Sequence, residues 1–252
     1  MTGKLIIVGL GPGPEGWVTD AARLAVSEAE IILGYSAYTN RIKSLPGQHI
    51  EASDNREEMS RAARALALAS DGKRVAVVSG GDPGVFAMAA AVFEAVDCGP
   101  VAWRGLDIRV EPGVTAMLAA AARIGAPLGH DFCAISLSNN LKPWALIEKR
   151  LTLAVEAGFV IALYNPASKA RPGQIGEAFA LLRTCCTPET IVMLARGVGR
   201  PDEDITITTL NQADPATVDM RTLVLIGSGA TRTIERTGGG VWVYTPRFCG
   251  EV

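Results

Sequence analysis

The amino-acid sequence predicts an α/β protein with two α/β domains, the first built on a mainly parallel sheet and the second on a mixed sheet. Two observations lead to this prediction. In the first half, apolar runs, glycine turns and helical patterns follow one another repeatedly, which is typical of a doubly wound α/β domain. Towards the end, short strand-like runs are joined only by turns, which favours antiparallel pairing.

The first domain is expected to span residues 1–126. Thr19 is the expected N-cap of its first helix, and Asp54 with Glu57 three residues later resembles a capping box for a helix that ends at residue 69. Apolar runs bounded by glycine, proline or polar residues predict strands at 5–8, 31–34, 74–79 and 108–111. The remaining helices are expected at 85–96 and 115–124.

The glycine-rich stretch 125–129 interrupts this alternation, so we expect a domain boundary after residue 126. The second domain would then span 127–246, followed by a disordered tail at 247–252. Helices are expected at 143–157 and 173–185, and strands at 133–137, 159–164, 190–195, 205–209, 222–226 and 241–244.

Composition excludes several classes of function. The 252 residues carry a formal net charge of −2, so no overall positive field would gather nucleic acid. No apolar run reaches the roughly 20 residues of a membrane span, and the first residues do not resemble a signal peptide, so a cytoplasmic protein is expected. The 5 cysteines form no C-x-x-C pair and there are 2 histidines, so no metal site is expected and catalysis would rely on a cofactor.

The first glycine loop, GLGPG at 9–13, follows the first strand, where a dinucleotide would bind. A dinucleotide motif needs a third glycine at position 14, which is Pro14, and an acidic residue after the second strand, which ends at Gly34 and Tyr35. From the residues alone, the loop is a structural turn, a ligand loop of another kind or, least favoured, a dinucleotide site.

Two more loops of this kind follow strands. In the loop at 79–85, Asp82 supplies a carboxylate that could accept hydrogen bonds at a ligand site, or could simply cap the next helix before Pro83. In the loop at 112–116, Thr115 could likewise be an N-cap. Because all three loops lie at the carboxyl edge of one predicted sheet, we favour a ligand pocket there.

The order and spacing of GLGPG (9–13), GGDP (80–83), PGVTA (112–116) and YNP (164–166) resemble the tetrapyrrole methylases, which use S-adenosylmethionine. The resemblance covers nearly the whole chain. It implies two α/β domains with the active site in the cleft between them, and a homodimer. The stretches that most resemble the branch of this family that methylates precorrin-3B at C17 are 34–38, 79–86, 125–132, 135–138 and 162–166.

The resemblance therefore implies methyl transfer from S-adenosylmethionine to C17 of precorrin-3B, with ring contraction to precorrin-4, in cobalamin biosynthesis. A cobalt-containing precorrin of the anaerobic route is the nearest alternative substrate. A methylase of the same fold acting on RNA or protein is a second alternative, although the balanced charge disfavours RNA. A non-catalytic nucleotide-binding module is a third, because glycine loops alone would suffice for it.

The resemblance also implies particular site residues. At 197–198 the chain has glycine and valine where many relatives have asparagine and alanine. The residues that match the family's cofactor contacts are Pro12, Gly80, Gly81, Asp82, Val85, Thr115, Ala116, Asn165 and Val198.

An activated methyl donor needs mainly in-line alignment with its acceptor, which suits a chain poor in histidine. Ring contraction also needs proton transfer, and His130 and Asp131 are the candidate acid–base groups. A structural hinge histidine and a solvent-facing turn acid are the alternative interpretations of these two residues. Candidate contacts to the substrate's carboxylates and rings, each of which could instead be an ordinary loop residue, are Tyr35, Tyr38, Arg41, Lys43, Lys142, Lys169 and Arg171.

Overall fold

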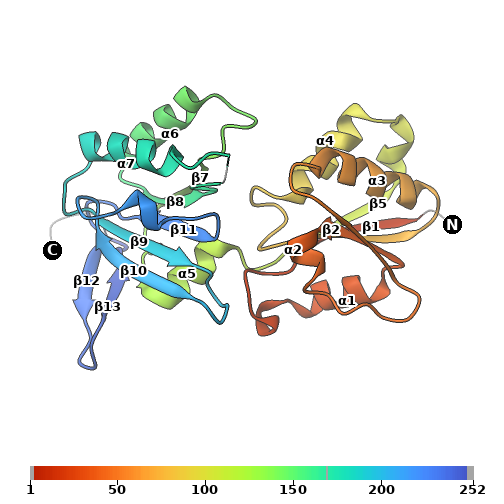
Figure 1. The fold of residues 1–252 in the computed structure, drawn as a ribbon, viewed down its shortest axis with the longest axis horizontal. Coiled ribbons are helices and arrows are strands. Elements are labelled where there is room, and N and C mark those ends of the chain that lie inside the picture. Colours follow the sequence, from red (N-terminus) through yellow and green to blue (C-terminus); the bar gives the residue numbers. More distant parts are fainter. Residues whose placement is uncertain (1–2, 169, 249–252) are drawn as a thin grey trace. The chain divides into compact units, whose positions relative to one another are not determined.

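The computed structural model describes residues 3–168 and 170–248 (Figure 1). The chain divides into two compact units, Met1–Thr115 and Ala116–Val252. This division differs from the boundary expected after residue 126, because helix α5 (Ala116–Ile124) packs on strands of the second unit. A strand, turn and helix pattern does not by itself show which sheet the helix covers. Of the expected tail, residues 249–252 lie outside the described part of the chain.

The first unit contains a five-stranded sheet in the order β3-β2-β4-β1-β5, and all its neighbouring strands are parallel. The carboxyl end of β1 therefore lies between those of β4 and β5, and the loops after these three strands are neighbours. The strands are β1 (Lys4–Gly9), β2 (Ile31–Tyr35), β3 (His49–Ser53), β4 (Arg74–Ser79) and β5 (Asp107–Glu111). The helices are α1 (Asp20–Glu28), α2 (Ser36–Thr39), α3 (Glu58–Ser70) and α4 (Met88–Cys98), with short 3-10 helices η1 (Glu15–Trp17) and η2 (Val101–Gly105).

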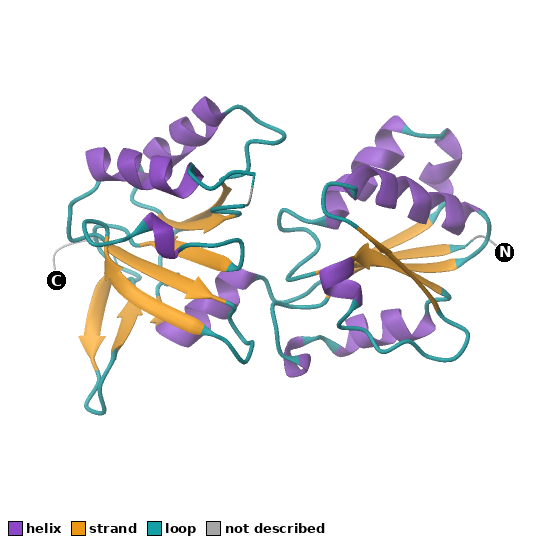
Figure 2. Cartoon of the chain, in the orientation of Figure 1, coloured by secondary structure: helices purple, strands orange, loops and turns teal. Residues whose placement is uncertain are grey.

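Both faces of this sheet are covered by helices (Figure 2). Successive side chains of a strand point to opposite faces, so an unbroken apolar run can fill two cores. In β1, Leu5 and Ile7 join the core under α3 and α4, whereas Ile6 and Val8 join the core under α1. The burial of both faces explains why these strands are recognisable in the sequence as continuous apolar runs.

The second unit contains a five-stranded mixed sheet in the order β10-β9-β11-β8-β7. Strands β7 and β8 are parallel and the remaining neighbours are antiparallel, which confirms the predicted mixed sheet. The strands are β7 (Phe132–Ser136), β8 (Val160–Tyr164), β9 (Ile191–Arg196), β10 (Asp204–Thr209) and β11 (Thr222–Ile226). Helices α6 (Trp144–Glu156) and α7 (Gln174–Cys185) cover one face through a core that includes Leu151 and Phe179.

A second, three-stranded sheet in this unit has the order β12-β13-β6. Its strands are β6 (Gly125–Ala126), β12 (Arg232–Glu235) and β13 (Val241–Tyr244), and a 3-10 helix, η3 (Pro215–Thr217), precedes β11. Only β13 was predicted. Strand β12 is exposed throughout, and the edge strand β3 of the first unit is no more than half-buried, so neither carries the apolar run on which strand prediction depends.

The helix starts test the sequence signals for capping. The Thr19 side chain accepts a hydrogen bond from the Ala22 amide at 3.1 Å, as expected. The predicted capping box at Asp54 is wrong, because the N-cap of α3 is Glu57. The Glu57 carboxylate accepts from the Asp54 amide at 3.3 Å, and the Asp54 side chain accepts from the Asn55 amide, both before the helix begins. Helix α4 begins at Met88 instead of residue 85. No helix among the described residues is long and apolar enough to cross a membrane.

Candidate cofactor and substrate site

The first and second glycine loops are joined directly through their backbones. The Leu10 amide donates to the Ser79 carbonyl at 2.9 Å, and Gly11 and Gly81 exchange two hydrogen bonds of 3.1 and 3.0 Å. Both glycines have positive φ angles, +63° and +66°, which side-chain-bearing residues rarely adopt. A Cβ atom on Gly9 would lie 2.8 Å from the Gly81 carbonyl oxygen. These positions therefore require glycine for the backbones to meet.

Asp82 ties the second loop to the third. Its Oδ1 accepts from the Gly84 amide at 2.8 Å and its Oδ2 accepts from the Gly113 amide at 3.0 Å. It does not cap α4, because the N-cap residue there is Ala87. The helix-cap interpretation is therefore wrong, and the carboxylate accepts from backbone donors of two loops. Gly113 of the third loop is thereby fixed to the second loop.

The segment after β2 holds both glycine loops from the side. The Arg41 guanidinium donates to the carbonyls of Leu10, Gly11 and Gly13, at 2.6, 2.9 and 3.2 Å. The ring of Tyr38 lies against Gly80, where a Cβ atom would approach Cε1 to 2.5 Å. We expected both side chains to contact substrate, but the structure places them on the loops.

The other residues of that segment are arranged differently. Tyr35 packs edge to face against Tyr38, with ring centroids 5.5 Å apart. The Lys43 residue is exposed. Tyr35 is the last residue of β2, and neither Tyr35 nor Lys43 has a hydrogen bond to the first glycine loop among those described.

The first loop is poor in amide donors. Its carbonyls at Gly11 and Gly13 precede Pro12 and Pro14, which have no N–H, and the Gly11 amide is bonded to Gly81. Phosphate-binding loops bind through several free amide groups, so this loop does not suit a pyrophosphate. Its carbonyl oxygens at Leu10, Gly11 and Gly13 are bound by the Arg41 guanidinium. The residues of this loop therefore argue against a dinucleotide.

In the second unit, Ala116 and Asn165 are connected through Tyr164 at the carboxyl end of β8. The Tyr164 hydroxyl accepts a hydrogen bond from the Met117 amide at 3.0 Å, which fixes the first turn of α5, where Ala116 lies. Asn165 has a φ angle of +52°, and its side-chain amide donates to the Ser136 hydroxyl at 3.0 Å. The YNP motif therefore connects the ends of β7 and β8 with the start of α5.

Two of the expected substrate cations lie in loops at this same edge. Lys142 lies between β7 and α6, where burial and the neighbouring positive charge of Arg150 lower its pKa. Arg171 lies between β8 and α7 and donates to the Gln174 side chain at 3.0 Å. Lys169 lies outside the described residues.

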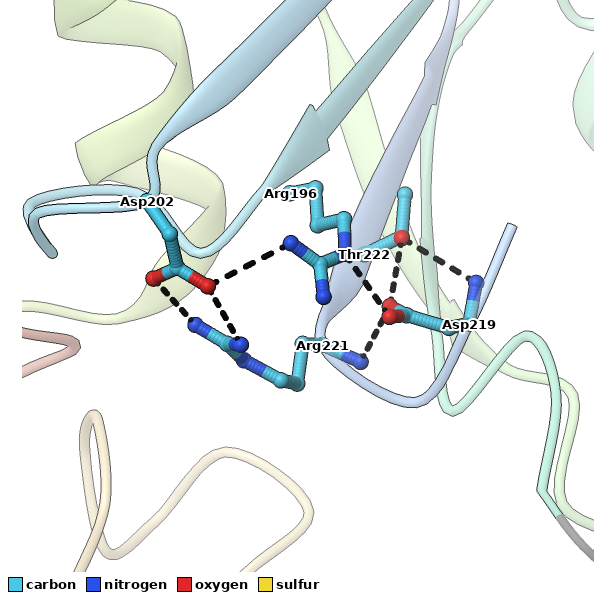
Figure 3. A network of polar contacts seen from close by, with 5 residues as sticks. All are labelled: Arg196, Asp202, Asp219, Arg221 and Thr222. Carbon is cyan, nitrogen blue, oxygen red and sulfur yellow. Dashed lines mark hydrogen bonds and ion pairs between the residues drawn. The ribbon is translucent and has the colours of Figure 1, made fainter. Parts of the chain in front are cut away.

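Val198 is buried in the turn between β9 and β10. Arg196 and Asp202, on either side of this turn, belong to an ionic network (Figure 3). The flanking glycines 197 and 199 have φ angles of +58° and +77°. Arg221 binds both oxygens of Asp202 at 2.6 and 2.7 Å, while Arg196 binds Asp219 at 2.8 Å and Asp202 at 3.4 Å. No sequence signal pointed to this network, because its members lie in three separate segments.

The network keeps its carboxylates ionised. The hydrogen bond from Arg221, with the nearby charges of Arg221 and Arg196, lowers the pKa of Asp202 to about 2. Burial of Asp219 opposes ionisation, but hydrogen bonds from the Arg196 side chain, the Arg221 amide and Thr222 outweigh it and lower its pKa. At neutral pH both carboxylates are therefore charged and hold the strands that flank the Val198 turn.

The candidate acid–base pair lies elsewhere in the second unit. His130 Nδ1 accepts a hydrogen bond from the Asp131 amide at 2.7 Å, and the Asp131 side chain is 77% exposed. Both residues precede β7, whereas Ser136 and Asn165 lie at the other end of the β7 and β8 pair. A five-residue strand separates the two ends by roughly 13–17 Å. The structure thus does not bring the pair to the cofactor positions of this unit.

Comparisons with known proteins agree with the order of these loops. Residues 4–214 match the family model described as Tetrapyrrole (Corrin/Porphyrin) Methylases. A precorrin-3B C(17)-methyltransferase of Sinorhizobium sp. is 58% identical over 98% of both chains. A probable cobalt-factor III C(17)-methyltransferase of Salmonella typhimurium is 41% identical over 90% of this chain and 93% of its own.

Solved structures show the same fold. The crystal structure of the methyltransferase CobJ has a TM-score of 0.92 and 50% identity, and the match covers 97% of this chain and all of that one. A uroporphyrin-III C-methyltransferase of Thermus thermophilus, complexed with S-adenosylhomocysteine, has a TM-score of 0.66 at 21% identity, covering 89% of this chain and 97% of that one.

Proposed function

The chain belongs to the tetrapyrrole (corrin/porphyrin) methylase family, and we propose that it methylates C17 of precorrin-3B in cobalamin biosynthesis. It is a methyltransferase that uses S-adenosylmethionine and yields precorrin-4 with ring contraction. The observation that carries this proposal is the 58% identity to a precorrin-3B C(17)-methyltransferase over 98% of both chains.

S-adenosylmethionine supplies a methyl group on a positively charged sulfur, which leaves as a neutral thioether when the acceptor carbon takes the methyl. The chain's own contribution is to bind the methyl donor and the tetrapyrrole and to orient them towards each other. The joined loops of the first unit present Pro12, Gly80, Gly81 and Val85, and Asp82 fixes their spacing through Gly84 and Gly113. The remaining proposed cofactor residues are Thr115, Ala116, Asn165 and Val198.

For the substrate we propose contacts from residues that the structure leaves at the carboxyl edges of the sheets. In the second unit these are Lys142 and Arg171, whose positive charges complement a polycarboxylate. Burial around Lys142 lowers its pKa, and a carboxylate of the substrate would stabilise the charged ammonium there. Tyr35 and Lys43 are the candidates in the first unit.

The proposal is tested by incubating the protein separately with precorrin-3B and with its cobalt-containing counterpart, each with methyl-labelled S-adenosylmethionine, and following the product by mass spectrometry. One labelled methyl group on a ring-contracted product is the expected result. Label on a cobalt-containing precursor alone would identify the activity of the Salmonella relative instead. Transfer of label to neither would contradict the proposal.

Two further properties belong to the proposal. We expect a homodimer, as the family resemblance implies, which light scattering coupled to size-exclusion chromatography measures directly. We also expect the protein to work in the cytoplasm, where S-adenosylmethionine and the tetrapyrrole intermediates would be available to it. Fractionation of cells that express the tagged protein tests this location.

A further inference from the structure

We propose that Arg41 is a positioning residue: it acts on the cofactor through the first glycine loop and binds no carboxylate of the tetrapyrrole. The inference rests on the proposed function for its ligand, and on the hydrogen bonds of the first unit for its geometry. From the sequence, a basic residue in this segment is instead expected to contact a carboxylate of the substrate.

The first step is the set of acceptors that the guanidinium binds. Nη1 donates to the Gly11 carbonyl at 2.9 Å, and Nη2 donates to Leu10 at 2.6 Å and to Gly13 at 3.2 Å. Three carbonyls of a five-residue loop thus point at one charged group. Hydrogen bonds to charged donors are stronger than neutral ones, and the planar guanidinium orients them in a fixed fork.

The second step is that two peptide groups of this loop lack an N–H. Pro12 and Pro14 supply no amide, so the peptides that follow Gly11 and Gly13 can be fixed only through their carbonyls. Arg41 binds both of those carbonyls. The amides of Leu10 and Gly11 tie the loop to the second loop, through Ser79 and Gly81. Arg41 holds the two peptide groups that have no N–H, those before Pro12 and before Pro14.

The third step is that Arg41 is itself held in place. The Arg41 amide donates to the Tyr38 carbonyl at 3.0 Å, and the next amide, of Ile42, donates to Thr39 at 2.9 Å. Thr39 is buried, and Tyr38 lies against Gly80 of the second loop. A single turn of chain thus contacts both glycine loops and sets their spacing. Removing the guanidinium would let the first loop relax, and binding would have to order it again.

The variants that test this are Arg41→Ala and Arg41→Lys, with Arg64→Ala as the control. Arg64 lies in the same unit and pairs with Glu51 through two hydrogen bonds of 3.1 and 3.0 Å, away from the glycine loops. For Arg41→Ala we expect the affinity for S-adenosylhomocysteine, measured by calorimetry, to fall on the order of tenfold or more. Arg41→Lys should fall between wild type and alanine, because an ammonium lacks the planar fork.

Steady-state kinetics separates the two roles. A positioning residue for the cofactor loop raises KM for S-adenosylmethionine and leaves KM for the tetrapyrrole within about twofold of wild type. A carboxylate contact would do the reverse, and that result would overturn the proposal. The Arg64→Ala protein should match wild type in both constants.

Hydrogen exchange provides a readout that needs neither ligand nor activity. In wild type the amides of Gly11 and Gly81 should be protected by their mutual bonds, and Arg41→Ala should accelerate exchange at both while leaving the β1 amides unchanged. Unchanged exchange at Gly11 and Gly81 would contradict the positioning role. If wild type binds no S-adenosylhomocysteine, the proposed function fails, but exchange still decides whether Arg41 orders the loop.

Discussion

The first unit and the second unit hold their candidate cofactor segments by different physical means. In the first unit, the glycine loops are fixed by backbone hydrogen bonds and by two charged side chains, Asp82 and Arg41, whose partners are backbone groups. In the second unit, the Val198 turn is flanked by partly exposed side-chain ion pairs among Arg196, Asp202, Asp219 and Arg221 (Figure 3). Geometry fixed by the backbone tolerates little substitution, whereas surface ion pairs weaken with salt and acid.

The largest loss of cofactor affinity is expected where the backbones of the glycine loops are in contact. In Gly113→Ala the new methyl group would overlap the Gly81 carbonyl oxygen and lie 2.9 Å from the Gly9 carbonyl, with no side chain able to move away. Overpacking of this kind typically costs about 1–3 kcal/mol. Calorimetric affinity for S-adenosylhomocysteine should fall by about 10- to 100-fold. Gly105→Ala, where nothing lies within 4 Å of the added Cβ, is the control and should bind normally.

Asp82→Asn should have the next largest effect. The carboxylate accepts from the amides of Gly84 and Gly113, and an asparagine would turn its own N–H donors towards one of them. Leaving such an amide unsatisfied costs about 1–3 kcal/mol, so affinity for S-adenosylhomocysteine should drop by around tenfold. Asp97→Asn, at an exposed site at the end of α4, provides the comparison. Equal affinity in Asp82→Asn and wild type would mean that the loops are fixed without it.

The stability that the ionic network gives the second unit should depend on pH, and not on small changes in side-chain volume. The pKa of Asp202 is lowered from 3.8 to about 2, so its contribution to stability is fully present above pH 4 and is lost as pH falls through 2. Thermal unfolding of wild type and Asp202→Asn should therefore differ modestly at pH 7, and the difference should shrink between pH 4 and pH 2. High salt should shrink it too. A difference that is independent of both pH and salt would show that charge does not support this turn.

The smallest effect is expected at the amino end of β7. Because His130 and Asp131 lie at the strand end opposite Ser136 and Asn165, His130→Gln should change kcat by less than about threefold. General acid–base groups that act in catalysis contribute about 10²–10⁴-fold. A loss of that size, with normal S-adenosylhomocysteine affinity and an altered pH profile, would restore the acid–base role that the sequence suggested.

Much of the fold could be predicted because it depends on local patterns. Leu5 to Val8 form a recognisable strand since both faces of the sheet are buried, and Thr19 caps its helix through a residue only three positions away. Strands β3 and β12 could not be recognised, because exposed edge strands need no apolar run. Helix α5 was assigned to the first domain because the sequence does not show which sheet a helix covers.

The candidate site divides in the same way. The sequence by itself determined the glycine loops, their order and the family, since glycine with a positive φ or at a close backbone contact has few substitutes. Only the tertiary structure decided what Arg41 and Asp82 bind, because their partners lie about thirty residues away and meet them through the strand order β3-β2-β4-β1-β5. The sequence identifies a charged residue, but its role depends on which backbone groups the folded sheet brings within hydrogen-bonding distance.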